Sequence, residues 1–213
     1  MTKNNLSIAV VDPIAPASSI VNQAVAVLTE GNLVVAPTET RYGLLARADR
    51  PLVLKKLYEV KKRPHKLPSA IFVKSIEDIS RYAELNNVAR KIATKLLPGP
   101  LTLVLKTKDN HDWEFVVNSK IGIRYSSAPF INHLLNKIDF PITATSANLS
   151  QGKECTTIEE IALLFKERIA LYVDGGELNN PVSTVVDLSG DKLEILREGA
   201  VATEAIERLL AQI

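Results

Sequence analysis

The chain has 213 residues, of which 46% are hydrophobic and 23% are charged, and its formal net charge is +2. We expect residues 1–213 to form a single domain, and the small net charge does not argue for a nucleic-acid partner, although local basic clusters leave that possibility open. A single cysteine, Cys155, excludes an internal disulfide, and no apolar run approaches the ~20 residues of a membrane span. The first residues do not resemble a signal peptide, so we expect a cytoplasmic protein with no membrane partner.

The apolar pattern alternates between strand-like and helix-like segments. Strands are predicted over short apolar runs bounded by turn signals, at residues 7–11, 33–36, 44–47, 69–73, 101–106, 116–117, 121–125, 171–173, 183–188 and 193–197. Helices are predicted at residues 18–30, 51–63, 86–97, 129–136, 156–168 and 203–213. Thr156 and Glu159 fit a capping box at the start of one helix. Because several strands follow one another directly, we expect an α/β fold that borders on α+β, with one twisted mixed sheet flanked by helices.

Several familiar sites are excluded. A P-loop is absent, since Ala147 stands where its first glycine belongs, and neither G-x-G-x-x-G nor G-x-S-x-G occurs. The three histidines, His65, His111 and His133, lie far apart without paired ligand spacing, so no metal site is predicted. Nothing beside Cys155 would lower its pKa, and we expect an inert thiol.

Residues 141–150, Pro-Ile-Thr-Ala-Thr-Ser-Ala-Asn-Leu-Ser, begin as a strand and continue as a run of small side chains. Several carry hydroxyl groups, including Thr145 and Ser146, and Asn148 adds an amide. Such residues at the end of a strand let a ligand approach the backbone and offer donors and acceptors. The alternative is an ordinary strand that ends in a serine- and asparagine-rich turn.

A basic cluster lies along the second predicted helix and just beyond it. Its members are Lys55, Lys56, Lys61, Lys62, Arg63 and Lys66. Cations favour the C-terminal turn of a helix, so a solvated helix end would explain the cluster without a ligand. As a site it would bind a polyphosphate, with Lys61 as a point charge and Arg63 as a planar donor.

Other candidates lie beside further predicted strands. The tripeptide Thr38-Glu39-Thr40 follows a buried strand, either as a hydroxyl-capped turn or as contacts to an amino acid or a phosphate. Arg124 and Arg197 each end a strand, where they are either solvated or part of a cationic crevice. Ser183 begins another strand and adds a hydroxyl group.

Eight stretches occur in the order and rough spacing of the YrdC-like family, at residues 37–44, 61–64, 97–102, 123–124, 145–148, 174–176, 183–187 and 196–199. The resemblance covers about residues 15–200. It implies a YrdC/RibB-like fold and an enzyme, an L-threonylcarbamoyladenylate synthase of the short single-domain form. Such an enzyme condenses L-threonine, bicarbonate and ATP to threonylcarbamoyl-AMP and pyrophosphate. The product would serve the N6-threonylcarbamoyl modification of adenosine 37 in tRNA, through a downstream threonylcarbamoyl-transferase complex.

The same resemblance assigns residues to the two substrates. It places ATP against Lys61, Arg63, Ser146, Asn148 and Arg197. It places L-threonine against Thr40, Arg124 and Ser183. No catalytic base is identified, and we expect ATP as a magnesium complex with no tightly bound metal.

Departures from the family pattern concern the amino acid more than the nucleotide. Arg41 replaces a usual aliphatic residue, Gln151 replaces a usual glycine, and Leu67 and Phe72 lie near positions of an asparagine and a threonine-binding histidine in some members.

Two alternatives stay open: a divergent paralogue with another substrate, and a module that binds tRNA or double-stranded RNA with steeply salt-dependent affinity. The presence of both the Lys-x-Arg and the Ser-x-Asn pair favours the synthase.

Overall fold

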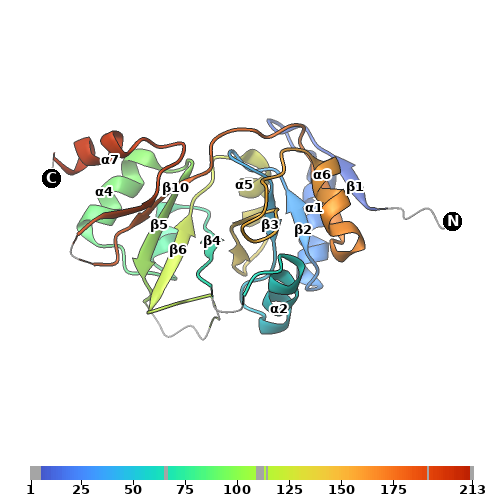
Figure 1. Ribbon diagram of the computed structural model, residues 1–213, viewed down its shortest axis with the longest axis horizontal. Helices are drawn as coiled ribbons and strands as arrows, with labels where there is room; N and C mark the ends of the chain where they lie inside the picture. The colour runs from blue at the N-terminus through green and yellow to red at the C-terminus, as the bar shows by residue number, and fades with distance from the viewer. Residues whose placement is uncertain (1–5, 65–66, 109–112, 114, 191, 212–213) are drawn as a thin grey trace.

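The computed structural model describes residues 6–64, 67–108, 113, 115–190 and 192–211. Lys66, His65 and His111 lie outside the described residues. The expected α/β class is confirmed, but the strands form two mixed sheets where one was expected. Figure 1 shows the two sheets side by side along the long axis, with β1 (Ile8–Val10) near one end and α7 (Thr203–Leu210) near the other.

The first sheet has five strands in the order β1-β9-β2-β3-β8. After β1, these are β9 (Leu171–Asp174), β2 (Val34–Ala36), β3 (Gly43–Leu45) and β8 (Thr145–Ser146). β1, β9 and β2 run parallel, whereas β3 is antiparallel to both of its neighbours. Every residue of β2 and β3 is buried, as their continuous apolar runs predict for strands covered on both faces.

The second sheet has six strands in the order β11-β10-β5-β6-β4-β7. These are β11 (Glu194–Arg197), β10 (Thr184–Asp187), β5 (Leu101–Lys106), β6 (Lys120–Arg124), β4 (Ala70–Phe72) and β7 (Ile142–Thr143). The predicted strand at 116–117 is wrong, since Val117 forms only an isolated bridge with Lys120. Asn118 and Ser119 between them have positive φ, which makes this segment a tight turn.

Helices cover both faces of the first sheet and one face of the second (Figure 1). On the first sheet, one face holds α1 (Ser18–Thr29) and α5 (Pro129–Leu135), and the other holds α2 (Pro51–Val60) and α6 (Ile158–Phe165). On the second sheet lie α3 (Ile76–Ile79), α4 (Asn87–Leu96) and α7, while the short 3-10 helix η1 (Lys166–Arg168) follows α6. The second sheet therefore keeps one face available for a site.

Two segments carry the chain between the sheets. Ala144 separates β7 of the second sheet from β8 of the first, and residues 175–183, here called the strap, lead from β9 to β10 (Figure 1). Phe72 of the second sheet shares a hydrophobic cluster with Ala36 and Leu45 of the first. We propose on this basis that the described residues form one folding unit.

The capping box of α6 lies one residue later than predicted. Thr157 is the N-cap, and its Oγ1 accepts a hydrogen bond from Glu160 N. Glu160 Oε2 in turn accepts from Thr156 N at 2.9 Å. The prediction with Thr156 and Glu159 is wrong because the cap must be the last extended residue before the helix, which is Thr157.

Candidate functional site

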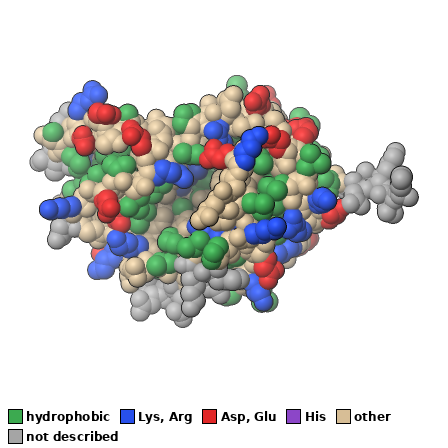
Figure 2. Space-filling view, viewed as in Figure 1, with side chains coloured by type: hydrophobic (Ala, Val, Ile, Leu, Met, Phe, Trp, Pro, Cys, Tyr) green, Lys and Arg blue, Asp and Glu red, His purple; other side chains and the backbone are tan. Residues whose placement is uncertain are grey.

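A cavity of about 440 Å³ opens between the two sheets. Its wall combines the free face of the second sheet with the loop between β2 and β3 and with β8. Figure 2 shows the hollow near the centre of the viewed face. The cations in the described wall are Arg41, Arg63, Lys120, Arg124 and Arg197, and the acidic residues are Glu154 and Asp187. This excess of positive charge favours an anionic ligand.

Strand periodicity assigns each residue of the second sheet to either the cavity or the core. In β6, Gly122 and Arg124 line the cavity, whereas Ile123 between them belongs to the hydrophobic core. In β5, Thr102 lines the cavity and Leu103 lies in the core. Successive side chains of a strand point to opposite faces, so these ligand-facing groups stand on a rigid sheet.

Arg124 lies in a buried polar network at the end of β6. Its Nη2 donates to Glu39 Oε1 at 2.8 Å and to Thr40 Oγ1 at 2.6 Å. Ser126 Oγ donates to the other carboxylate oxygen of Glu39, and the guanidinium lies 5.5 Å from the ring centroid of Phe72. Arg124 is 9% exposed, and its buried Nε has no hydrogen-bond partner among the described residues. Since buried donors are almost always paired, this Nε is available to a ligand.

Ser183 and Arg197 form another part of the wall. Arg197 donates from Nε and Nη2 to the carbonyl oxygen of Ser183 at 3.1 and 2.8 Å, and from Nη2 to Ser183 Oγ at 3.1 Å. Ser183 Oγ also lies 3.0 Å from Thr102 Oγ1. Burial lowers the pKa of Arg197, and the charge of Arg124 lowers it further. An anion bound near both guanidinium groups would relieve their repulsion.

Arg63 lies just beyond α2, where the chain turns toward β4. Its backbone N–H donates to Tyr58 O at 2.9 Å, and its Nη2 donates to Pro68 O. Its Nε is buried and has no partner among the described residues, and burial lowers the pKa of the guanidinium. Arg63 therefore brings a second available donor to the cavity.

Ser146 and Asn148 lie where β8 ends. Ser146 lines the cavity, and its Oγ donates to Asn148 Oδ1. Asn148 Nδ2 donates to Leu149 O at 2.9 Å and to Gly152 O at 3.3 Å. Residues 141–150 therefore begin with the strands β7 and β8, and the chain from Ser146 to Gly152 then forms an internally hydrogen-bonded turn beside the cavity.

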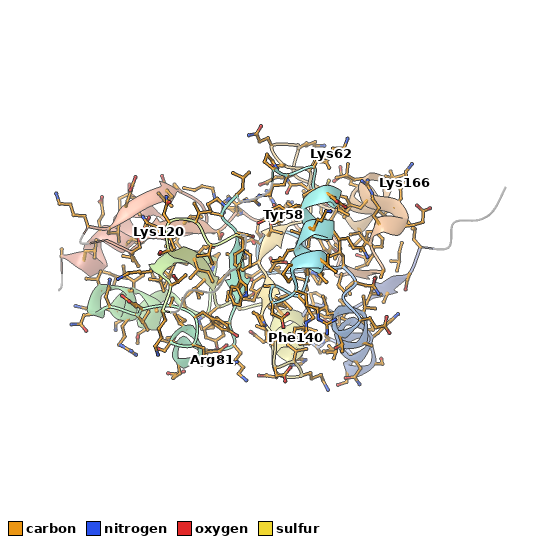
Figure 3. All side chains as sticks on the ribbon, turned by 90° about the horizontal axis from the view of Figure 1, so that it is seen from below. Tyr58, Lys62, Arg81, Lys120, Phe140 and Lys166 are labelled. Atoms are coloured by element: carbon orange, nitrogen blue, oxygen red, sulfur yellow. The ribbon has the colours of Figure 1, made fainter. Side chains whose placement is uncertain are left out.

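The basic cluster separates into inward and outward side chains. Lys61 is 2% exposed, and its Nζ donates to the carbonyl oxygens of Ser146 and Asn148, the latter at 2.9 Å. Burial lowers the pKa of Lys61 to about 7, and the charge of Arg63 contributes to the shift. Lys62 is exposed at the end of α2, as labelled in Figure 3. The cluster is therefore not one solvated helix end.

Some of the residues that depart from the family pattern line the cavity, and others lie outside its described wall. Arg41 lines the cavity, donating from Nε to Glu154 Oε2 at 2.9 Å and from Nη1 to Leu178 O of the strap at 3.2 Å. Gln151 has a φ of 59°, a conformation that favours glycine. Leu67 is 38% exposed and is not part of the described cavity wall.

Lys120 and Asp187 form an ion pair within the cavity wall. Lys120, labelled on β6 in Figure 3, donates from Nζ to Asp187 Oδ2 at 2.8 Å. Burial raises the pKa of Asp187, but the hydrogen bonds from Lys120 and Ser189 outweigh burial and leave the pKa below its ordinary value. Asp187 is therefore a paired carboxylate at neutral pH.

The structure brings six of the eight predicted site residues to the wall of one cavity. These are Thr40, Arg63, Arg124, Ser146, Ser183 and Arg197. Asn148 bonds to Ser146 without being part of the described wall, and Lys61 is buried with its Nζ on backbone carbonyl groups. The prediction omitted Ser126, Lys120 and Asp187. Counting in steps of two from Arg124 and Ser183 would have reached Lys120 and Asp187, but Ser126 lies outside a strand.

Neither a metal-binding cluster nor a membrane-spanning helix occurs among the described residues. No group of three or more His, Cys, Asp or Glu side chains among them could hold a metal ion. No helix in the described part of the chain has the length and apolar character needed to cross a membrane. Cys155 is half-buried, and burial raises the pKa of its thiol.

Comparison with known proteins identifies the family. The Sua5_yciO_yrdC family model, described as telomere recombination, matches residues 26–199. The chain is 36% identical over 96% of its length to the threonylcarbamoyl-AMP synthase of Bacillus subtilis, and it spans 60% of that protein. It is 33% identical over 89% of its length to the human threonylcarbamoyl-AMP synthase, of which it covers 70%.

Solved structures give the same result for the fold. The crystal structure of Pyrococcus abyssi Sua5 complexed with L-threonine matches with a TM-score of 0.88 and 31% identity, over 97% of this chain and 61% of that one. Escherichia coli YciO matches with a TM-score of 0.87 and 24% identity, over 94% of this chain and 99% of that one. The chain therefore belongs to the Sua5/YciO/YrdC family.

Proposed function

We propose that the chain is an L-threonylcarbamoyladenylate synthase, which condenses L-threonine, bicarbonate and ATP and releases pyrophosphate. The observation that carries this proposal is the buried Nε of Arg124, which has no partner in the described part of the chain, in a wall that also holds Arg63 and Arg197. A donor for a carboxylate beside cations for a polyphosphate suits an amino acid and ATP together. The relatives named threonylcarbamoyl-AMP synthase support the same activity.

The amino-acid end of the proposed site is built around Arg124. The free Nε would donate to the threonine carboxylate, while Nη2 stays on Thr40. The paired hydroxyl groups of Ser183 and Thr102 would accept a hydrogen bond from the hydroxyl group of threonine or donate one to it. Phe72 also lines the cavity and offers an apolar surface to the methyl group.

The nucleotide end would use the remaining cations. Arg63 and Arg197 would neutralise the phosphates, and Ser146 with Asn148 would supply neutral hydrogen bonds. Both acidic residues in the described wall are already paired, Glu154 with Arg41 and Asp187 with Lys120. We therefore propose that Mg²⁺ enters with ATP, held by phosphate oxygens and water.

The chemistry requires two bond-forming steps. The threonine amine attacks the carbon of bicarbonate, which forms the carbamate N–C bond and releases water. A carbamate oxygen then attacks the α-phosphorus of ATP, and the bond to the β-phosphate breaks to release pyrophosphate. The cations fixed in the cavity wall would stabilise the charge that develops on the phosphates, and the wall would hold both reactants in contact.

Further partners follow from the product. We propose that threonylcarbamoyl-AMP passes to a threonylcarbamoyl-transferase complex that modifies tRNA, and that the protein acts in the cytoplasm, where ATP and tRNA are available. The support for this step is the named activity of the relatives. Co-purification of a transferase subunit or transfer of labelled product to tRNA would test it.

The proposed activity is tested by measuring pyrophosphate release from ATP and bicarbonate, with and without L-threonine and with L-serine as a control. Threonine-dependent release is the expected result. Arg63→Ala and Asn148→Ala should abolish it while the fold is kept, and Lys62→Ala, on an exposed neighbour of Arg63, should not. Wild-type rates in the first two variants would contradict the site.

The same assay separates the alternatives. Release with another amino acid would indicate a divergent paralogue in which residues such as Arg41 and Phe72 have changed the substrate. No release, combined with RNA affinity that falls steeply with salt, would indicate an RNA-binding module.

A further inference from the structure

Lys61 was expected to contact ATP, yet its side chain does not face the cavity. It is the C-cap residue of α2 and is 2% exposed. Arg63, two residues further on, is part of the described cavity wall, whereas Lys61 is not. A phosphate in the cavity would therefore meet Arg63 and not the amino group of Lys61.

Three hydrogen bonds join Lys61 to the turn that follows β8. Its Nζ donates to Ser146 O and to Asn148 O, the latter at 2.9 Å. In return, Ser150 N donates to Lys61 O at 2.9 Å. The two residues whose carbonyl groups are held are the same two whose side chains bond to each other beside the cavity. Lys61 thus fixes the main chain that carries both side chains.

Lys61 can hold the turn whether its amino group is protonated or neutral. Burial lowers its pKa to about 7, with a contribution from the charge of Arg63. A neutral amine still has two N–H donors, which are enough for two carbonyl groups, but it has no charge for a phosphate. The contacts to Ser146 and Asn148 therefore do not depend on the charge.

We propose that Lys61 is a positioning residue that holds the Ser146-Ala147-Asn148 turn in its nucleotide-binding geometry without touching the phosphates. This inference rests on the proposed binding of ATP in the cavity. Removing Lys61 would weaken nucleotide binding through the turn, and it would take no charge away from the cavity wall.

The test is ATP affinity by calorimetry over a range of salt concentrations, for wild type and for methionine variants at three neighbouring positions. Lys61→Met should raise the Kd roughly tenfold or more, because two hydrogen bonds to the turn are lost. The slope of log Kd against log salt should stay at the wild-type value. Arg63→Met should make the slope shallower, because it removes a cavity charge. Lys62→Met, at the exposed neighbour labelled in Figure 3, is the matched control and should change neither quantity.

A double-mutant cycle gives an independent readout. If Lys61 acts through the turn, the losses from Lys61→Met and Asn148→Ala should not add, because Lys61 holds the main chain that carries the Asn148 side chain, and Asn148→Ala removes that side chain. Lys61→Gln keeps N–H donors without a charge, so it should bind ATP more tightly than Lys61→Met. The glutamine variant also carries the salt measurement if the methionine variant does not fold.

Three results would overturn the inference: unchanged affinity in Lys61→Met, a slope as shallow as that of Arg63→Met, or fully additive losses with Asn148→Ala. Absence of ATP binding by the wild-type protein would instead refute the proposed function. The two failures are therefore distinguishable in one set of titrations.

Discussion

Replacing Glu39 with alanine should strongly destabilise the protein, because it leaves a buried charge without its partner. The side chains of Arg124 and Glu39 are 10% and 12% exposed, and they approach to 2.8 Å. Removing one partner of such a pair costs about 3–5 kcal/mol. Ser126 would also lose its acceptor. For a chain of this length the loss corresponds to a fall in Tm of roughly 6–20 °C.

Urea unfolding followed by circular dichroism measures this loss. Glu39→Gln should be destabilised less than Glu39→Ala, because its amide oxygen can still accept from Arg124. The matched control is Glu84→Ala, which breaks the pair of Glu84 with Lys106, where the atoms are 3.6 Å apart and the side chains are 54% and 58% exposed. That control should lower the free energy of unfolding by less than about 1 kcal/mol, because exposed ion pairs contribute little to stability.

Equal losses in Glu39→Ala and Glu84→Ala would refute the reasoning, since Arg124 would then be no more dependent on its partner than a surface lysine. A second measurement connects this pair to the proposed substrate. Glu39→Ala protein that is still folded should bind L-threonine more weakly than wild type, because Glu39 no longer holds the guanidinium of Arg124.

Three further predictions concern the pH dependence, the sheet and the cavity mouth. Lys61 has a pKa of about 7 when folded against 10.5 ordinarily, so the unfolded chain binds the extra proton between these values. The stability of wild type relative to Lys61→Met should therefore rise with pH from 7 to about 10, by up to about 1.4 kcal/mol per unit. Urea titrations at pH 7 and 9 check this, and a constant difference would contradict it. Gly122→Ala should destabilise by about 1–3 kcal/mol, because its Cβ would lie 2.8 Å from Ala70 Cβ, and thermal melts would show it. Arg41→Met should lower the free energy of unfolding by less than about 1 kcal/mol, because its partner Glu154 is 42% exposed. Calorimetry should nevertheless show weaker ATP binding, because the cavity wall loses a cation.

Local sequence signals predicted most elements but not the division into two sheets. Continuous apolar runs identified β2, and alternation identified β5, because burial on one or both faces leaves its period in the chain. Neither signal specifies which strands pair. The sheet change at Ala144 occurs within a run of small residues that has no distinguishing period.

The same limit applies to the site. Arg124, Ser183 and Arg197 were predicted as site residues because polar residues at strand ends are visible in the sequence, and the structure places all three in the cavity wall. The pairing of Arg124 with Glu39 spans 85 positions and depends on the fold that joins the sheets. The inward direction of Lys61 was hidden too, because its partners are carbonyl groups, which every residue has.

The alternation along β5 and β6 has a consequence for how such a protein can diverge. Exchanging Thr102 or Val104 alters the chemistry offered to a ligand while leaving the packing of Leu103 intact. Substrate preference and fold stability are thus encoded at interleaved positions and can change independently. A one-residue insertion in either strand would exchange the two sets, burying polar groups and exposing the core, so length changes are expected only in the connecting loops.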